Sequence, residues 1–132
     1  MFAMRAPIRL AHGGIMEIQD VPTSLEVVAA VQGAALLIRL RGVATYKDTA
    51  VLQECIRMIE KHSQPLVVID LAGLEFIGSA ALGALIAIKK RVGACGGQLR
   101  LAALTSAVRE VLTVAGLSNF FSVCGNAEEA LS

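Results

Sequence analysis

Aromatic and charged residues are scarce in this chain of 132 residues. Tryptophan is absent, tyrosine occurs once, aromatic residues make up 4% of the chain, and the formal net charge is +1. Proteins that bind nucleic acid normally present clustered basic side chains together with aromatic rings that stack on bases. The sequence has one basic cluster, the run Lys89-Lys-Arg91. We therefore expect no direct binding to nucleic acid.

Residues that commonly bind metals are also few. His12 and His62 are isolated, and Cys55, Cys95 and Cys124 form no C-x-x-C pair. No metal site can therefore be assembled at a recognisable spacing. Three separated cysteines fit reduced thiols rather than a disulfide framework. We expect a cytoplasmic protein without a metal or any other cofactor.

Long hydrophobic runs are missing as well, although 55% of the residues are hydrophobic. A membrane-spanning helix needs about 20 consecutive apolar residues, and the longest candidate, 77–88, stops at Lys89. The first residues of the chain are too few and too interrupted for a signal peptide, and either Met1 or Met16 can be the physiological start. We expect no membrane span.

The chain length and the hydrophobic pattern favour a single domain. Residues 1–24 have no clear period and are expected to form a flexible N-terminal arm, whereas 25–132 are expected to fold. The turn signal Gln32-Gly33 between two apolar runs predicts an antiparallel hairpin. The expected strands are 25–31, 34–41, 66–69, 98–101 and 120–123, and the expected helices are 49–61, 79–92, one capped by Ser106 and closed by Gly116, and a short last one after Asn126.

This order of elements, ββαβαβαβα, predicts an α/β fold. Right-handed crossovers through the helices generate a mixed, mostly parallel β-sheet in which the first hairpin is the one antiparallel pair. Strands 34–41 and 66–69 should lie side by side and parallel, because a helix connects them.

Motifs for catalysis are absent from the sequence. There is no P-loop, no G-x-G-x-x-G after the first strand and no G-x-S-x-G around Ser79. No histidine follows His62, so a serine hydrolase triad in the order Ser, Asp, His cannot form. Asp70 has no acidic neighbour that would help it hold magnesium. We expect that the protein is not an enzyme.

The junction between the strand at 66–69 and the following helix is the most informative part of the chain. A turn rich in small residues leads into a helix whose first residue is Ser79. Such a junction exposes free backbone N–H groups and the positive end of a helix dipole. The Ser79 hydroxyl can therefore be a helix cap worth about 1 kcal/mol, an anion site, or an acceptor of phosphate. The residues alone leave these three roles open.

The run Asp70-Leu-Ala-Gly-Leu-Glu-Phe-Ile-Gly-Ser-Ala-Ala-Leu-Gly-Ala-Leu85 resembles the pattern D-L-S-x-V-x-F-I-D-S-S-G-L-G-x-L of STAS domains. This family includes the anti-sigma factor antagonists and the C-terminal domains of sulfate transporters. The resemblance extends over most of 25–132. It includes the second strand with Gly42, the segment Ala50-Val-Leu52 of the first helix, and the later strand and helix at 96–117.

This resemblance implies a function for Ser79. In the antagonist proteins an anti-sigma factor kinase phosphorylates the serine at this position, and a metal-dependent serine phosphatase reverses the reaction. The candidate partner-binding residues here are Thr45, Gly78, Ser79, Ala80, Leu82 and Gly83. The chain departs from the family pattern in three places: Gly78 replaces the aspartate before the serine, Ala80-Ala81 replaces S-G, and Thr45 replaces the aspartate of G-x-L-D.

The resemblance thus implies a non-enzymatic, partner-switching regulator that binds an anti-sigma factor kinase under control of phosphorylation at Ser79. An alternative is a constitutive STAS scaffold module of a stressosome-like or transporter-associated complex, with Ser79 as a cap. A third is a binder of a small ligand or anion at the helix N-terminus. A second copy of the chain is a further candidate partner.

Overall fold

The computed structural model describes residues 3–4 and 25–132. The flexible arm expected at 1–24 lies outside the described residues except for Ala3–Met4, and it stays a prediction. The elements in chain order are β1 (Ala3–Met4), β2 (Leu25–Gln32), β3 (Ala35–Ala44), η1 (Tyr46–Asp48), α1 (Thr49–His62), β4 (Leu66–Ile77), α2 (Ser79–Ala94), β5 (Gln98–Ala102), α3 (Ser106–Val114), β6 (Ser122–Cys124) and α4 (Ala127–Leu131).

The strands form one sheet in the order β1-β2-β3-β4-β5-β6. β2 and β3 pair antiparallel as a hairpin, and β3, β4, β5 and β6 are all parallel. The predicted mixed, mostly parallel sheet is confirmed, as is the parallel pairing of β3 with β4. The expectation of a single antiparallel pair was wrong, because β1 also pairs antiparallel with β2. This short strand comes from a segment without any hydrophobic period.

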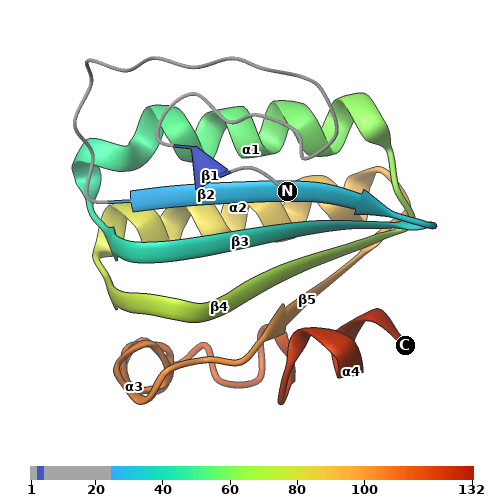
Figure 1. Ribbon diagram of the computed structural model, residues 1–132. Coiled ribbons are helices and arrows are strands. Elements are labelled where there is room, and N and C mark those ends of the chain that lie inside the picture. The colour runs from blue at the N-terminus through green and yellow to red at the C-terminus, as the bar shows by residue number, and fades with distance from the viewer. Residues whose placement is uncertain (1–2, 5–24) are drawn as a thin grey trace.

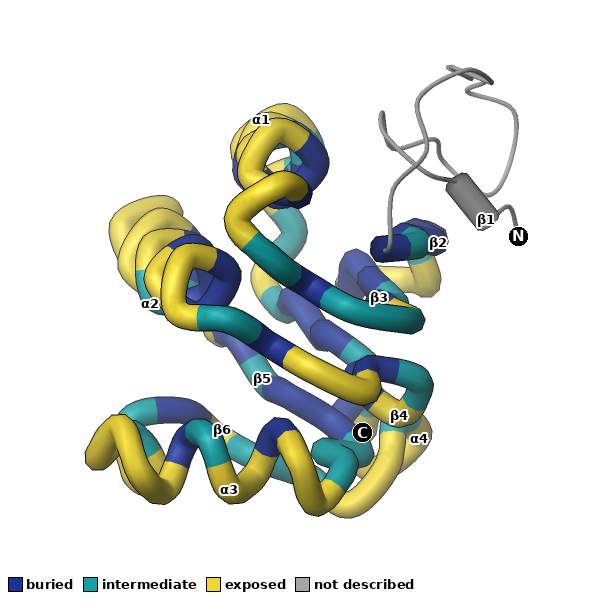
Figure 2. Tube along the Cα trace, turned by 90° about the vertical axis from the view of Figure 1, so that its left-hand side faces the viewer, coloured by how far each residue is buried: buried dark blue, intermediate teal, exposed yellow. Residues whose placement is uncertain are grey.

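Helices cover the two faces of the sheet unequally. The main hydrophobic core includes the apolar sides of α1, α2 and α3, packed on one face. α1 and α2 run side by side across the sheet (Figure 1). The five-residue α4 packs on the other face, in a small second cluster with Leu37, Val68 and Ala102. Buried residues follow the strands and the inner sides of α1 and α2 (Figure 2).

Two strands are longer than the sequence predicts. β3 continues to Ala44, beyond the expected strand at 34–41, and β4 continues to Ile77, through the expected turn. β3 and β4 remain paired over these added residues, although the register shifts after Arg39 and again after Gly42. Gly42 has φ 96, a conformation that other residues adopt only with strain. Both strands therefore end together, directly before Thr45 and Gly78.

The start of α3 also differs by one residue from the prediction. The N-cap is Thr105 rather than Ser106, and its Oγ1 accepts a hydrogen bond from the N–H of Val108 at 3.3 Å. The same hydroxyl donates to the carbonyl oxygen of Leu74 at 2.8 Å. Thr105 thus ties the helix to β4, a contact that Ser106 does not make. Among the residues described, no helix combines the length and the apolar content needed to cross a bilayer.

Candidate functional site

The ends of β3 and β4 bring the candidate residues together. Ala44 lies opposite Ile77 in the last register pair of the two strands. One residue later, the backbone N–H of Gly78 donates a hydrogen bond to the carbonyl oxygen of Ala44 at 2.8 Å. Because parallel strands end at the same edge of a sheet, Thr45 after β3 and Ser79 after β4 lie at one edge of the molecule.

Ser79 is the first residue of α2, and it is exposed. The N-cap is Gly78, with extended dihedral angles (φ −85, ψ 171), and its carbonyl oxygen accepts the first helical hydrogen bond from Leu82 at 2.9 Å. The interpretation of Ser79 as the cap was therefore wrong, because a capping residue must have the extended backbone that Gly78 has. The Ser79 hydroxyl is left at the surface.

The positive N-terminal end of α2 is not neutralised by its own first turn. No side chain in the described part of the chain caps this helix, and its first turn contains no acidic residue. Backbone N–H groups and the positive end of a helix dipole therefore lie beside the Ser79 hydroxyl without a negative group. A negative charge added at this position would be stabilised.

A short 3-10 turn holds the corner after β3. Thr45 Oγ1 accepts a hydrogen bond from the N–H of Lys47 at 3.2 Å. Asp48 Oδ2 accepts from the Thr45 N–H at 2.8 Å and from Thr45 Oγ1 at 3.3 Å. Asp48 is fully buried, so the corner is a rigid part of the site. The spacing T-x-x-D is a capping-box signal in the sequence, and it could have identified Asp48.

The exposed residues at this edge differ from the predicted set. Ser79, Ala80 and Gly83 are exposed and Thr45 and Gly78 are half-buried, whereas Leu82, also in the predicted set, is 8% exposed and packs in the hydrophobic core. Two exposed aromatic side chains were missed: Tyr46 (72% exposed) and Phe76 (49%). We call the following set the Ser79 surface: Thr45, Tyr46, Phe76, Gly78, Ser79, Ala80 and Gly83.

No feature of the sequence pointed to the two aromatic residues. Phe76 is the next-to-last residue of β4, a strand that was expected to stop earlier, and it lies opposite Val43 in the register of β3 with β4. Tyr46 is in η1, which contacts α2. Their exposure depends on how far both strands continue, which the local pattern does not reveal.

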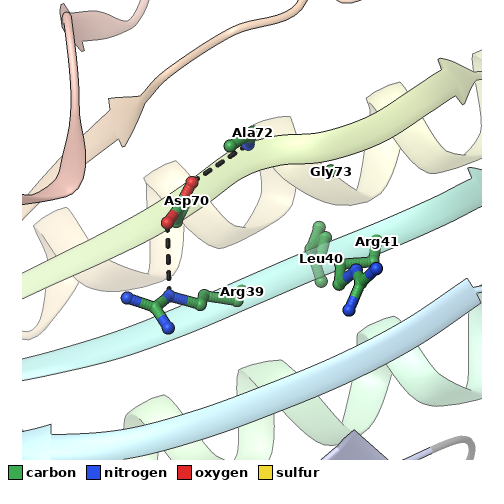
Figure 3. Close-up of a pocket in the computed structure, with 6 residues that line it drawn as sticks. All are labelled: Arg39, Leu40, Arg41, Asp70, Ala72 and Gly73. Atoms are coloured by element: carbon green, nitrogen blue, oxygen red, sulfur yellow. Dashed lines mark hydrogen bonds and ion pairs between the residues drawn. The ribbon is translucent and has the colours of Figure 1, made fainter.

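A second feature is a hollow of about 340 Å³ on β3 and β4. Figure 3 shows Arg39 reaching Asp70, while Arg41 lies further along β3. Arg39 Nε is 3.2 Å from Asp70 Oδ2, and Asp70 Oδ1 accepts a hydrogen bond from the Ala72 N–H at 3.0 Å. Gly73 makes room for Arg41, since a Cβ there would lie 2.7 Å from Arg41 Cγ.

Each of the two arginines that line this hollow lies near a carboxylate. Arg39 is paired with Asp70, and Arg41 Nη1 lies 3.7 Å from Glu26 Oε1. Arg39 and Asp70 follow Leu37 and Val68 by two residues, so they lie on the face of the sheet that carries α4. The hollow is thus distinct from the Ser79 surface.

The cysteines offer no reactive centre at the Ser79 surface. Burial raises the pKa of the Cys55 thiol from 9.0 to about 12, with a further contribution from Glu54. Cys55 is therefore a neutral core residue on α1. Within residues 25–132, no three His, Cys, Asp or Glu side chains are grouped so that they could hold a metal ion.

The fold and the site define a class of protein: a small α/β domain with an exposed serine where a central parallel strand meets its helix. The STAS domain pattern matches residues 26–130. The chain belongs to the STAS domain family. It is 31% identical over 95 residues to BtrV of Bordetella bronchiseptica, which carries the name of an anti-sigma factor antagonist; the match covers 72% of this chain and 82% of BtrV.

Solved structures have the same fold. An anti-sigma factor antagonist from Mycobacterium paratuberculosis superposes with a TM-score of 0.74 at 25% identity, covering 84% of this chain and 94% of the other. The anti-sigma factor antagonist SpoIIAA, in its unphosphorylated form, gives a TM-score of 0.64 at 19% identity, covering 81% and 92%. Bacillus SpoIIAA has also been solved in a phosphorylated form, with a TM-score of 0.59 at 18% identity and coverage of 81% and 96%. This chain therefore has the fold of anti-sigma factor antagonists.

Proposed function

We propose that this protein is a non-enzymatic, cytoplasmic partner-switching regulator that binds an anti-sigma factor kinase through the Ser79 surface. Phosphorylation of Ser79 by that kinase weakens the complex, and a serine phosphatase restores it. The observation that carries the proposal is the exposed Ser79 hydroxyl at the uncapped N-terminus of α2. The names of BtrV and SpoIIAA support the assignment of an anti-sigma factor as partner.

The helix end suits a phosphate group. A phosphoserine carries a charge of about −1.5 to −2 and three strong acceptor oxygens. At Ser79 these oxygens would lie next to the free N–H groups of the first turn of α2, which has no acid and no capping side chain of its own within the described chain. The modification is therefore compatible with the fold.

The neighbouring surface explains why the same phosphate would weaken binding. Tyr46, Phe76 and Ala80 are exposed and uncharged. A partner that covers these side chains removes water from them, and a dianion in the middle of such a contact would have to lose its hydration shell without compensation. The modified chain would thus keep its fold and lose its partner.

A second candidate function has its own observation. The two positions where the family pattern has acids carry Thr45 and Gly78, and neither is charged. If a kinase needs those acids for recognition, the domain would act as a constitutive scaffold module of a stressosome-like or transporter-associated complex, and Ser79 would stay unmodified.

One experiment separates the two functions. Each histidine-kinase-like ATPase encoded in the source genome is purified, and incubated with the full-length chain and ATP; phosphate is then located by peptide mass spectrometry. The regulator predicts one phosphate on Ser79, none on a Ser79→Ala variant, and binding of the ATPase to the unmodified chain. Absence of both binding and phosphorylation with every such ATPase would favour the scaffold.

A further inference from the structure

Two of the four aromatic side chains in the described residues lie exposed at the Ser79 surface. Tyr46 is 72% exposed and Phe76 is 49% exposed. The other two, Phe120 and Phe121, pack edge to face with ring centroids 5.0 Å apart, and Phe121 is buried. Exposed aromatic rings are costly to keep in water, and aromatic side chains are common anchors of protein interfaces.

None of the residues of the Ser79 surface is charged. Asp48 is buried and its carboxylate is bonded to Thr45, so it presents no charge to a partner. Lys47 and Glu75, one of each sign, are the adjacent exposed charges along the chain. A partner with a basic contact face would therefore find no acid on the residues of the Ser79 surface.

The backbone conformation at residue 78 does not require glycine. Its φ of −85 is open to any residue. A Cβ there would lie 3.5 Å from Phe76 Cε2, 3.6 Å from the Ala44 carbonyl oxygen and 3.9 Å from Thr45 Cα, which are ordinary contacts. A side chain at position 78 would thus fit the fold, and it would cover the edge of the Phe76 ring.

Building on the proposed function, we infer that Tyr46 and Phe76 anchor the kinase partner and that Gly78 determines specificity by leaving the Phe76 ring open. The partner face that fits is apolar and without a basic cluster. An acid at position 78 would both cover the ring and add a charge that such a face cannot pair, so it would reject this partner.

The test uses the full-length chain and the ATPase that binds it in the experiment above, titrated by isothermal calorimetry. Tyr46→Ala and Phe76→Ala are each expected to weaken binding at least about tenfold. Val114→Ala is the matched control, because Val114 is 82% exposed on α3, outside the Ser79 surface, and it should bind as the wild type does. Thermal unfolding of each variant checks that the fold is intact.

Charge at position 78 is tested separately. Gly78→Asp is expected to weaken binding at least about tenfold, and Gly78→Ala is expected to weaken it less. Raising the salt concentration should change the wild-type affinity little, because salt screens ion pairs and the inferred contact with this surface contains none. Unchanged binding by both aromatic variants, or tighter and strongly salt-dependent binding by Gly78→Asp, would overturn this inference and leave the proposed function standing. Failure of the wild-type chain to bind any ATPase would overturn both.

Discussion

The N–H of Gly78 is bonded to the carbonyl oxygen of Ala44 at 2.8 Å, and this bond joins the ends of β3 and β4 one residue before α2 begins. It fixes the position of the N-cap of α2 relative to the corner at Thr45, which Asp48 holds from inside. The Ser79 surface is therefore assembled from two chain segments that are joined to each other, and under the proposed function it should be formed before a partner arrives.

Replacing Ser79 by alanine should hardly change stability. Ser79 does not cap α2, and alanine is the better helix former, so the free energy of unfolding should stay within about 0.5 kcal/mol of the wild type. Ser79→Asp should raise it by about 0.3–1 kcal/mol, because a negative charge then meets the positive end of the dipole. Urea unfolding of the three proteins measures this. A loss of about 1 kcal/mol in Ser79→Ala would restore the role of cap.

The same two variants should separate in binding. Ser79→Asp should weaken the affinity for the kinase partner by about tenfold or more, which corresponds to about 1.4 kcal/mol, because the charge is desolvated in an apolar contact. Ser79→Ala should bind as the wild type does. Equal affinity of all three proteins, measured by calorimetry, would contradict a phosphorylation switch at this residue.

Gly78→Asp should stabilise the fold. Aspartate is a better N-cap than glycine by a few tenths of a kcal/mol, and the position accepts a side chain without a clash. Gly42→Ala is the contrasting control: Gly42 has φ 96, and a Cβ there should cost about 1 kcal/mol or more. The melting temperatures of the two variants show whether each substitution stabilises or destabilises the fold. Destabilisation by Gly78→Asp would mean that the backbone at residue 78 needs glycine.

Among the polar residues near the site, Asp48 should be the one whose substitution lowers the free energy of unfolding most. Asp48→Ala removes the acceptor for the Thr45 N–H and hydroxyl inside a fully buried environment, and the expected loss is about 1–3 kcal/mol. Partner affinity should fall as well, because the corner that presents Tyr46 loses its support. Thr45→Ser keeps the hydroxyl and should be nearly neutral. An Asp48→Ala variant as stable as the wild type would refute the role of this contact.

Cys55 should make stability fall at alkaline pH. Burial raises its pKa from 9.0 to about 12, so the unfolded chain releases this proton at a lower pH than the folded chain does. The contribution is complete below about pH 9 and is lost as the pH rises toward about 12, at up to 1.36 kcal/mol per unit. Urea unfolding at several pH values measures how the free energy of unfolding changes with pH, and Cys55→Ala should lack this decrease between about pH 9 and about pH 12. Identical slopes would contradict it.

Sequence reasoning could predict those elements that carry a local pattern. The α1 helix has a clear apolar face, and the crossover between β3 and β4 dictates that they pair in parallel. The end of β4 could not be predicted, because Ala72 and Gly73 have weak strand propensity and follow the course of β3. A helix cap was one of the three roles open to Ser79, because serine commonly caps helices, but the cap is decided by the extended backbone of Gly78. Tyr46 and Phe76 are exposed because both strands end together, which is a tertiary effect.

The open position at Gly78 has a consequence for cells that contain several related regulators. A single substitution there changes charge and access to Phe76 without disturbing the core. Two copies of a gene could diverge at this one codon and acquire separate partners while their scaffolds stay interchangeable. Signalling pathways built on the same domain can in this way be insulated from each other by a change that leaves folding untouched.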